Sequence, residues 1–105
     1  MTTFDERERE FEARFKHDQE LQFKVTARRN RLLGLWAAER MGLAGDAAQA
    51  YAKEVVEAEF KGGDRHVIAK LVADLATKGS AVTEAQVKFQ LDHLAAQAKQ
   101  QIMRE

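Results

Sequence analysis

Residues 76–87 read "ATKGSAVTEAQV" and contain the signals that end one helix and begin another. Gly79 follows a run of helix-forming residues, and glycine is the residue that most often ends an α-helix. Thr83 and Gln86 stand three positions apart, the spacing of a capping box in which each side chain bonds to the other residue's backbone amide. This stretch therefore predicts two helices joined by a short loop.

The rest of the chain repeats this arrangement. It contains no proline and is rich in strong helix formers, which favours an all-α fold. Two further boundaries place glycines before an aspartate that is a candidate N-cap: Gly42 and Gly45 before Asp46, and Gly62 and Gly63 before Asp64. Because the loops are short, sequential helices should pack antiparallel. The sequence predicts an antiparallel four-helix bundle with helices at about 20–41, 46–61, 64–78 and 83–103.

Each predicted helix carries apolar residues at spacings of three and four, the pattern of a buried face. These stripes are Leu21, Val25, Leu32, Leu35 and Trp36; Ala47, Ala48, Tyr51, Val55 and Ala58; Val67, Ile68, Leu71, Val72 and Leu75; and Val87, Leu91, Leu94, Ala95, Ala98 and Ile102. We interpret them as the core. Gly34, on the other side of the first helix, either allows another helix to approach closely or lies at the surface.

Composition restricts the class of protein. The 105 residues include 45% hydrophobic residues, enough for one modest core. There is no cysteine, and the formal net charge is zero, which argues against nucleic acid or an anionic membrane as the partner. No apolar run reaches membrane-spanning length, and the N-terminus lacks a signal-type apolar segment. We expect a cytoplasmic protein without direct membrane insertion.

No motif supports an enzyme. The glycines of "KGGDRH" (61–66) lack the spacing and the Lys-Ser/Thr pair of a phosphate-binding loop, so only weak ATP or ADP binding stays open. Ser80 has no histidine near it in sequence, and the three histidines have no partner at metal-binding spacing within a helix. We therefore expect no catalytic residue, no metal and no required cofactor.

The basic run "RRNR" (28–31) has two readings. Three arginines on one helix can hold a phosphate or a nucleic acid, which gives a nucleic-acid-binding or nucleotide-responsive helical module as an alternative function. In an overall neutral protein, such a run is more often a solvated or ion-paired face. We favour the second reading and expect no nucleic-acid partner.

The first residues differ from the rest. Residues 1–20 contain seven acids and four bases, a net charge of minus three, whereas residues 21–40 contain one acid and five bases, a net charge of plus four. On a helical wheel, Phe4, Phe11 and Phe15 form one narrow stripe, displaced by about 100° from the stripe that starts at Leu21. The change of phase falls near Asp18, a candidate cap. We predict an arm at residues 1–18 and a helical domain at 19–105. One continuous helix through both parts stays an alternative, because no glycine or proline interrupts the chain before Gly34.

The arm itself allows two interpretations. An isolated helix of about 15 residues is marginal in water, so we expect the arm to be partly disordered when free and to fold on a partner. The alternative is that its phenylalanines pack on the protein's own body, between two of its helices. Opposite charges on the arm and on the first helix would support such a contact weakly.

Four segments carry a resemblance to a known family: "MTTFDERE" (1–8), "FKHD" (15–18), "ARRNRLLGLWAAERMGL" (27–43) and "AYAKEVV" (50–56). Together they resemble the zeta subunit family of α-proteobacterial F-type ATP synthases. The similarity covers essentially the whole chain, and "RRNRLLGLWAAE" (28–39) is its most specific part.

The resemblance implies a non-enzymatic inhibitor of ATP hydrolysis. Its N-terminal arm would insert at a catalytic α/β interface beside the central stalk, so that the partner is the catalytic sector with its alpha, beta and gamma subunits. The protein would be cytoplasmic, and peripheral to the inner membrane when bound to the ATP synthase. The expected partner-binding residues are Phe4, Asp5, Arg7, Glu8, Phe11, Glu12, Arg14 and Phe15, with a hinge at His17 and Asp18.

Overall fold

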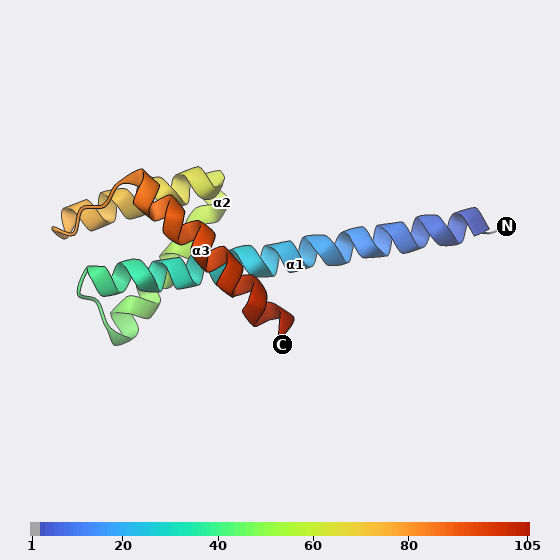
Figure 1. The fold of residues 1–105 in the computed structure, drawn as a ribbon, viewed down its shortest axis with the longest axis horizontal. Coiled ribbons are helices and arrows are strands. Elements are labelled where there is room, and N and C mark those ends of the chain that lie inside the picture. Colours follow the sequence, from blue (N-terminus) through green and yellow to red (C-terminus); the bar gives the residue numbers. More distant parts are fainter. Residues whose placement is uncertain (1–2) are drawn as a thin grey trace.

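The computed structural model describes the backbone of residues 3–105 and the side chains from Lys16 onward. This part of the chain folds into three helices without a strand: α1 (Thr3–Arg40), α2 (Gly45–Thr77) and α3 (Glu84–Met103). The all-α prediction is thus confirmed. The predicted antiparallel four-helix bundle is wrong, because three helices replace four and α3 crosses α1 obliquely (Figure 1).

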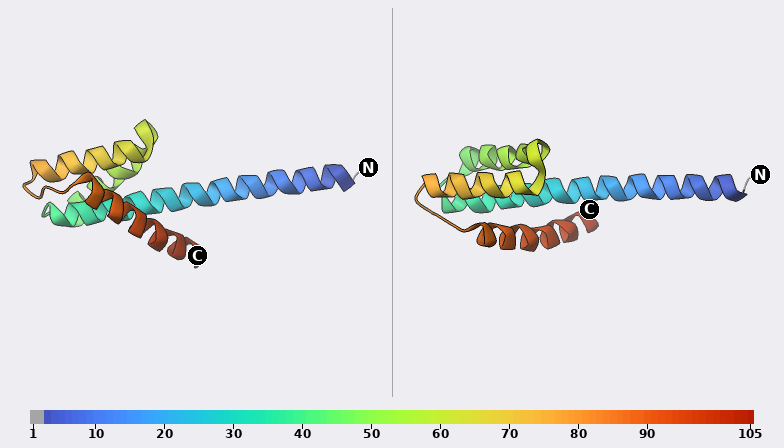
Figure 2. Two further views of the ribbon diagram at one scale, coloured as in Figure 1. Left: turned by 45° about the horizontal axis from the view of Figure 1, so that its top comes forward. Right: turned by 90° about the horizontal axis from the view of Figure 1, so that it is seen from above.

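The missing helix boundary lies inside α2, where the sequence placed two separate helices at 46–61 and 64–78. Gly62 and Gly63 have non-helical backbone angles there, with φ of −174° and 71° respectively. The positive φ at Gly63 is a conformation that residues with a Cβ avoid. The two glycines therefore bend α2 sharply without separating it into two elements, and the chain reverses direction at this kink (Figure 2).

Two of the predicted helix ends are confirmed in detail. Gly42 follows α1 with φ of 78°, and the bonds Leu43 N to Ala38 O and Gly42 N to Glu39 O form a Schellman motif. At the start of α3, Thr83 and Gln86 form the expected capping box. The expected cap at Asp46 is wrong: Ala44 is the N-cap of α2 and makes no side-chain capping bond, while Asp46 lies in the first turn.

The core forms where α1, α2 and α3 meet. Its members share nearly complete burial: Leu33, Ala37, Ala38, Tyr51, Val55, Ala58, Val67, Leu71, Leu75, Val87, Leu91 and Leu94. The predicted stripes of the two halves of α2 and of α3 supply most of these residues. On α1 the prediction is less accurate, because Leu33 is fully buried whereas Leu32 and Leu35 are only partly buried.

Gly34 allows α1 and α2 to approach closely. A Cβ built at Gly34 would lie 2.6 Å from the Cα of Ala52 and 3.1 Å from a methyl carbon of Val55. Real side chains do not tolerate the shorter of these distances, so glycine is required for the observed spacing. Of the two readings left open by the sequence, the structure supports close helix approach.

Helix α1 is longer than expected. The sequence placed its start near residue 20, with Asp18 as a possible cap, but α1 runs without a break from Thr3. Its N-terminal part projects from the body formed by the remaining helical segments (Figure 1), and the molecule measures 65 × 25 × 20 Å. Within the described residues, none of the helices is sufficiently long and apolar to cross a bilayer. The arm and the domain at 19–105 thus share one helix, and the expected disorder of the arm stays a prediction.

Candidate functional site

The predicted partner-binding residues all belong to the projecting part of α1. The side chains of Phe4, Asp5, Arg7, Glu8, Phe11, Glu12, Arg14 and Phe15 lie outside the described residues, although their backbone is helical. The predicted hinge residues His17 and Asp18 are helical and exposed. The structure therefore brings the partner-binding positions onto one helix, while their contacts stay a prediction.

A buried polar cluster fastens α1 to α2 on both sides of the kink. The guanidinium of Arg29, which is 7% exposed, donates to Asp64 at 2.8 Å and to Glu59 at 3.1 Å. The fully buried Asn30 accepts from Arg29 at 2.8 Å and donates to Glu59 at 2.9 Å. Among the described residues, no buried side-chain polar atom lacks a partner. The cluster is thus a fully satisfied network, as a buried charge requires.

The two carboxylates of this cluster respond differently to their surroundings. Burial raises the pKa of Glu59, and the neighbouring Asp64 adds to this effect, against the lowering effect of the Asn30 and Arg29 contacts. The hydrogen bond from Arg29 lowers the pKa of Asp64, since it favours the ionised form. Asp64 is therefore the principal counter-ion of Arg29. This acidic position, expected to cap a separate helix, instead receives the arginine across the kink.

The other two arginines of "RRNR" are also engaged. Arg28 donates to Gln101 at 2.9 Å and forms an ion pair with Glu105, which ties the end of α3 to α1. Arg31 donates to Gln49 at 2.8 Å, at the exposed surface between α1 and α2. All three arginines thus make contacts within the chain, and Arg28 and Arg29 are ion-paired, as the second interpretation allowed.

A second polar cluster lies between the halves of α2. Tyr51 donates to Asp74 at 2.7 Å, and burial together with this acceptor raises the pKa of the Tyr51 hydroxyl. The Lys70 ammonium lies 3.0 Å from Asp74 and 3.3 Å from Glu54. Burial opposes its charge, but the hydrogen bond and attraction of Asp74 and Glu54 outweigh burial and raise the pKa of Lys70. This cluster holds the two halves of α2 together.

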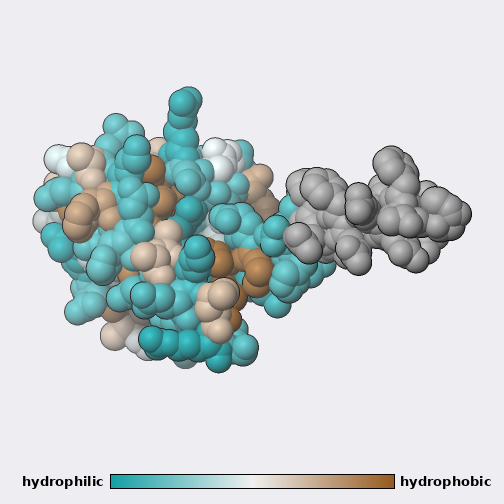
Figure 3. Space-filling view, turned by 45° about the vertical axis from the view of Figure 1, so that its right-hand side comes forward, coloured by the Kyte–Doolittle hydropathy of each residue, from teal (hydrophilic) through white to brown (hydrophobic). Residues whose placement is uncertain are grey.

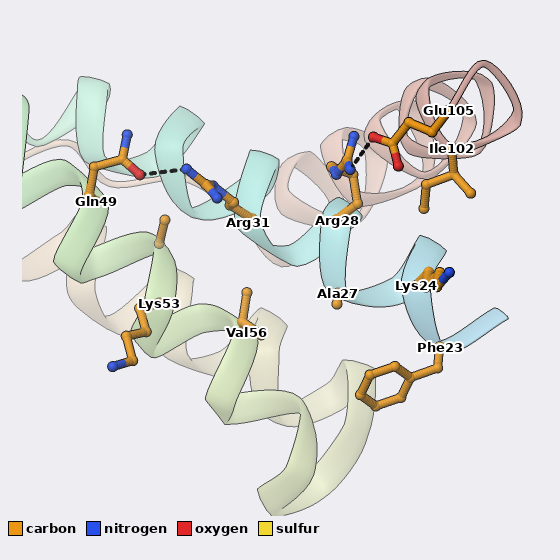
Figure 4. A pocket seen from close by; sticks show the side chains of 11 residues that line it. Phe23, Lys24, Ala27, Arg28, Arg31, Gln49, Lys53, Val56, Ile102 and Glu105 are labelled. Carbon is orange, nitrogen blue, oxygen red and sulfur yellow. Dashed lines mark hydrogen bonds and ion pairs between the residues drawn. The ribbon is translucent and has the colours of Figure 1, made fainter. Parts of the chain in front are cut away.

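An open groove runs between α1 and α2 beside the projecting part of α1. Its volume is about 680 Å³, larger than that of three other hollows of the described surface, at 370, 190 and 80 Å³. It is lined by Phe23, Lys24, Ala27, Arg28, Arg31, Gln49, Ala52, Lys53, Val56, Ile102 and Glu105. Helices α1 and α2 form its walls, and the end of α3 lies at one end (Figure 4). The groove therefore combines an apolar floor with a positively charged rim, in which Glu105 is the single acidic side chain.

Two exposed aromatic side chains extend this apolar surface toward the kink. The rings of Phe23 and Phe60 lie 6.0 Å apart between centroids, with 59% and 69% of these residues exposed. Large apolar residues exposed side by side are unusual on a soluble surface and mark sites of interaction. The space-filling view shows apolar patches of this kind within a mainly hydrophilic surface (Figure 3).

The described residues contain no cluster of three or more acidic or histidine side chains suited to a metal ion. His93 instead stacks on Phe89, with ring centroids 6.5 Å apart. His66 and His17 are exposed. These histidines therefore show no arrangement typical of metal ligation.

The sequence did not predict the partners of the arginine run. It also assigned no role in a site to two members of the Arg29 cluster, Asn30 and Glu59, or to three residues in or beside the groove, Phe23, Phe60 and Lys53. The only local signal was the position of Asn30 between two arginines on the face that carries Leu33, which places a polar group next to the core. The contacts of Glu59 and Phe60 depend on how the first half of α2 packs on α1, and that of Asp64 depends on the kink, whose direction the glycines alone do not specify.

One comparison with known proteins names a family. A sequence model described as "ATPase inhibitor subunit zeta" matches residues 1–101. A solution NMR structure is 46% identical in sequence and superposes with a TM-score of 0.71, covering 80% of this chain and 96% of that chain. A search of curated proteins gives no match.

Proposed function

The chain belongs to the ATPase inhibitor subunit zeta family. On that premise, we propose that it blocks ATP hydrolysis by inserting its N-terminal helix into an F-type ATP synthase, at a catalytic α/β interface near the central stalk. Membership of the family assigns an ATPase-inhibitor role and implies binding to an ATP synthase. The place of insertion and the contacts with the alpha, beta and gamma subunits are the proposal. Catalytic interfaces open and close during turnover, so a helix wedged between two subunits stops the cycle.

The observation that supports this mechanism best is the projection of α1. Residues 3–15 continue the helix away from the body, in the form that helix-in-groove recognition requires (Figure 1). The helix is anchored at its other end by Arg29 and by the close approach at Gly34. The body thus holds one end of α1 and directs the backbone of the arm away from itself (Figure 1).

Within the arm, we assign the apolar anchors to Phe4, Phe11 and Phe15, which share one stripe at helical spacing. The charged residues between them would set the register through ion pairs with the ATP synthase. They are Asp5, Arg7, Glu8, Glu12 and Arg14. His17 and Asp18 would then mark the point where the inserted helix leaves the interface.

The test is a truncation. Deleting residues 1–18 is expected to leave a folded, helical domain that no longer inhibits the cognate ATPase, because the anchors are gone while the core and the Arg29 cluster remain. Circular dichroism checks the fold, and ATP hydrolysis by the isolated catalytic sector checks inhibition. Unchanged inhibition by the truncated chain would overturn the proposed mechanism.

The alternative nucleic-acid function has lost its main support. Arg29 is buried and paired with carboxylates, and Arg28 is paired with Glu105, so these guanidinium groups already have partners within the chain. A gel-shift titration at low salt tests this alternative, because nucleic-acid binding by arginines weakens steeply as salt rises.

Weak binding of ATP or ADP stays a prediction of the sequence. The backbone after Gly63 is a poor phosphate site, since the Asp64 carboxylate already accepts from Arg29 there. The cationic rim of the groove, with Lys24 and Lys53, is better suited to an anion. NMR shift perturbation on addition of ATP tests for binding at either place.

A further inference from the structure

We propose that the groove between α1 and α2 is a docking site for the chain's own arm: the helix breaks at His17–Asp18, and residues 1–15 fold back into the groove. The extended α1 seen in the structure is then the open form of an equilibrium. Docking itself does not depend on the proposed function. Its regulatory consequence does, because a docked arm would be withheld from the ATP synthase.

Charge is the first argument. Residues 1–15 contain five acids and three bases, a net charge of minus two. The rim of the groove carries Lys24, Arg28, Arg31 and Lys53 against the single acid Glu105, a net charge of plus three. Lys24 and Lys53 make no ion pair with any carboxylate from Lys16 onward, so both are available to acidic residues of the arm. These opposite charges make the acidic arm a better ligand for the groove than a neutral or cationic segment would be.

The apolar surfaces also match. The floor of the groove is formed by Phe23, Ala27, Ala52, Val56 and Ile102, and the Phe23 ring is 59% exposed. The arm carries its three phenylalanines on one narrow face, which Glu8 borders, while its other acidic residues lie on other faces. An amphipathic helix with aromatic anchors is the usual ligand of an apolar groove between two helices.

The length of the chain fits a short helical hairpin. Helix–helix turns in such hairpins have two to five residues, and Lys16–Glu20 are all exposed, so a turn there disturbs no core contact. A turn centred at about residue 19 would place Phe15 beside Phe23 and Phe11 beside Ala27. The stretch of α1 from Phe23 to Arg31 is about 12 Å long, comparable to the length of about 16 Å from Phe15 to Phe4.

The phase of the helix argues against two extended chains as the docked form. Phe11 and Ala27 are 16 residues apart, which on one straight helix turns them to nearly opposite sides, about 160° apart. Two extended α1 helices paired antiparallel would therefore point the phenylalanine stripe of one away from the groove of the other. A break at His17–Asp18 removes this restriction, because it lets the arm rotate independently.

The experiment uses the full chain, which has no cysteine and therefore accepts a single spin label. A nitroxide on Thr3→Cys lies about 30 Å beyond Phe23 along an extended α1. We expect paramagnetic broadening of the amide signals of Gln49, Lys53 and Val56 at low salt, and its loss at high salt. Absence of broadening at low salt would overturn the proposal.

Variants and mixing separate docking from chance contact. Lys24→Glu with Lys53→Glu is expected to reduce the broadening several-fold, whereas Lys88→Glu, an exposed lysine of α3 outside the groove, should leave it unchanged. Equal broadening in both variants would contradict the proposal. The proposal would also be contradicted by a mixing experiment in which chains that carry the nitroxide, but no ¹⁵N, broaden the signals of ¹⁵N-labelled chains that carry no nitroxide. That result would identify a second copy as the occupant. None of these measurements requires ATP synthase, so the result is independent of the inhibitory mechanism.

Discussion

The Arg29 guanidinium lies 2.8 Å from the carboxylate of Asp64, and this contact joins the middle of α1 to the first residue after the kink in α2. Arg29 also binds Glu59, which precedes the kink. One side chain therefore holds both sides of the bend against α1. The glycines permit the bend, and Arg29 fixes its direction.

We expect Arg29→Met to lower the free energy of unfolding by about 2–3 kcal/mol, because it leaves Glu59 and Asn30 without their charged partner. Asp64 adds little to this loss of stability, because it is partly exposed and water can replace the Arg29 guanidinium as its hydrogen-bond donor. Urea unfolding followed by circular dichroism measures the change in the free energy of unfolding. Arg31→Met is the matched control: it removes one exposed bond to Gln49, and a loss as large as that of Arg29→Met would contradict this account.

The contact with Arg29 should also make stability depend on acid pH. The pKa of Asp64 is lowered in the folded state, so its contribution is present above the unfolded value of about 3.9 and is lost as pH falls through the folded pKa. Asp64→Asn is therefore expected to be less stable than the wild type at pH 7, with a difference that shrinks below about pH 4. Urea unfolding over a pH series measures this difference, and a constant difference at all pH values would refute the prediction.

Glu59 should have the opposite effect. Its folded pKa is raised, so its contribution is complete below the unfolded value of about 4.3 and is lost as pH rises through the folded pKa. Gln cannot ionise, and its amide oxygen can still accept from Asn30. Relative to the wild type, Glu59→Gln is therefore expected to gain stability between pH 3 and pH 7. Asp64→Asn, measured in the same series, serves as the control of opposite sign.

Gly34→Ala should destabilise the protein, although alanine is the better helix former by about 1 kcal/mol. The new Cβ would lie 2.6 Å from the Cα of Ala52, which is a backbone atom and cannot rotate away. We expect a net loss of about 1–3 kcal/mol in thermal or urea unfolding. Adding Ala52→Gly removes only the contact of 3.3 Å with the Ala52 Cβ and should not restore stability; a full rescue would show that the backbone distance is not limiting.

Inhibition should depend on the arm's rings. If Phe15 is an anchor, Phe15→Ala removes about 1.5–3 kcal/mol of apolar burial in the complex, which corresponds to a rise of about 10- to 100-fold in the concentration needed for half-inhibition. Inhibition of ATP hydrolysis by the isolated catalytic sector is the measurement. Phe89→Ala is the matched control, an exposed phenylalanine of α3 remote from the arm. Equal effects of the two substitutions would contradict the anchoring role.

Local patterns predicted most of the fold. The capping box at Thr83, the helix end at Gly42 and the buried faces of α2 and α3 follow from short-range spacing, and all are confirmed. Two errors share a cause. The sequence suggested boundaries at Asp18 and at Gly62–Gly63 from local signals, whereas the helix hydrogen bonds continue through the first and the second is a kink.

The candidate site was less predictable. Its groove is formed by residues far apart in sequence, such as Phe23, Val56 and Ile102, and depends on how closely α1 and α2 approach at Gly34. Of the arginine run, expected to be solvated or ion-paired, Arg28 and Arg29 form ion pairs, but their partners could not be read from local sequence. The eight partner-binding residues of the arm stay predictions, because the partner that would contact them determines their role.

The continuity of α1 has a mechanical consequence for insertion. A single helix, side chains included, is about 10–12 Å wide. Perpendicular to its long axis, the whole molecule measures 25 × 20 Å. If the helix inserts as proposed, a cleft that admits only its width would stop the protein where α3 first meets α1, near Leu21 and Val25, which share a hollow with Ile102 and Met103. The body would then set how far the helix enters, so that the number of residues ahead of Leu21 fixes the depth that the tip can reach.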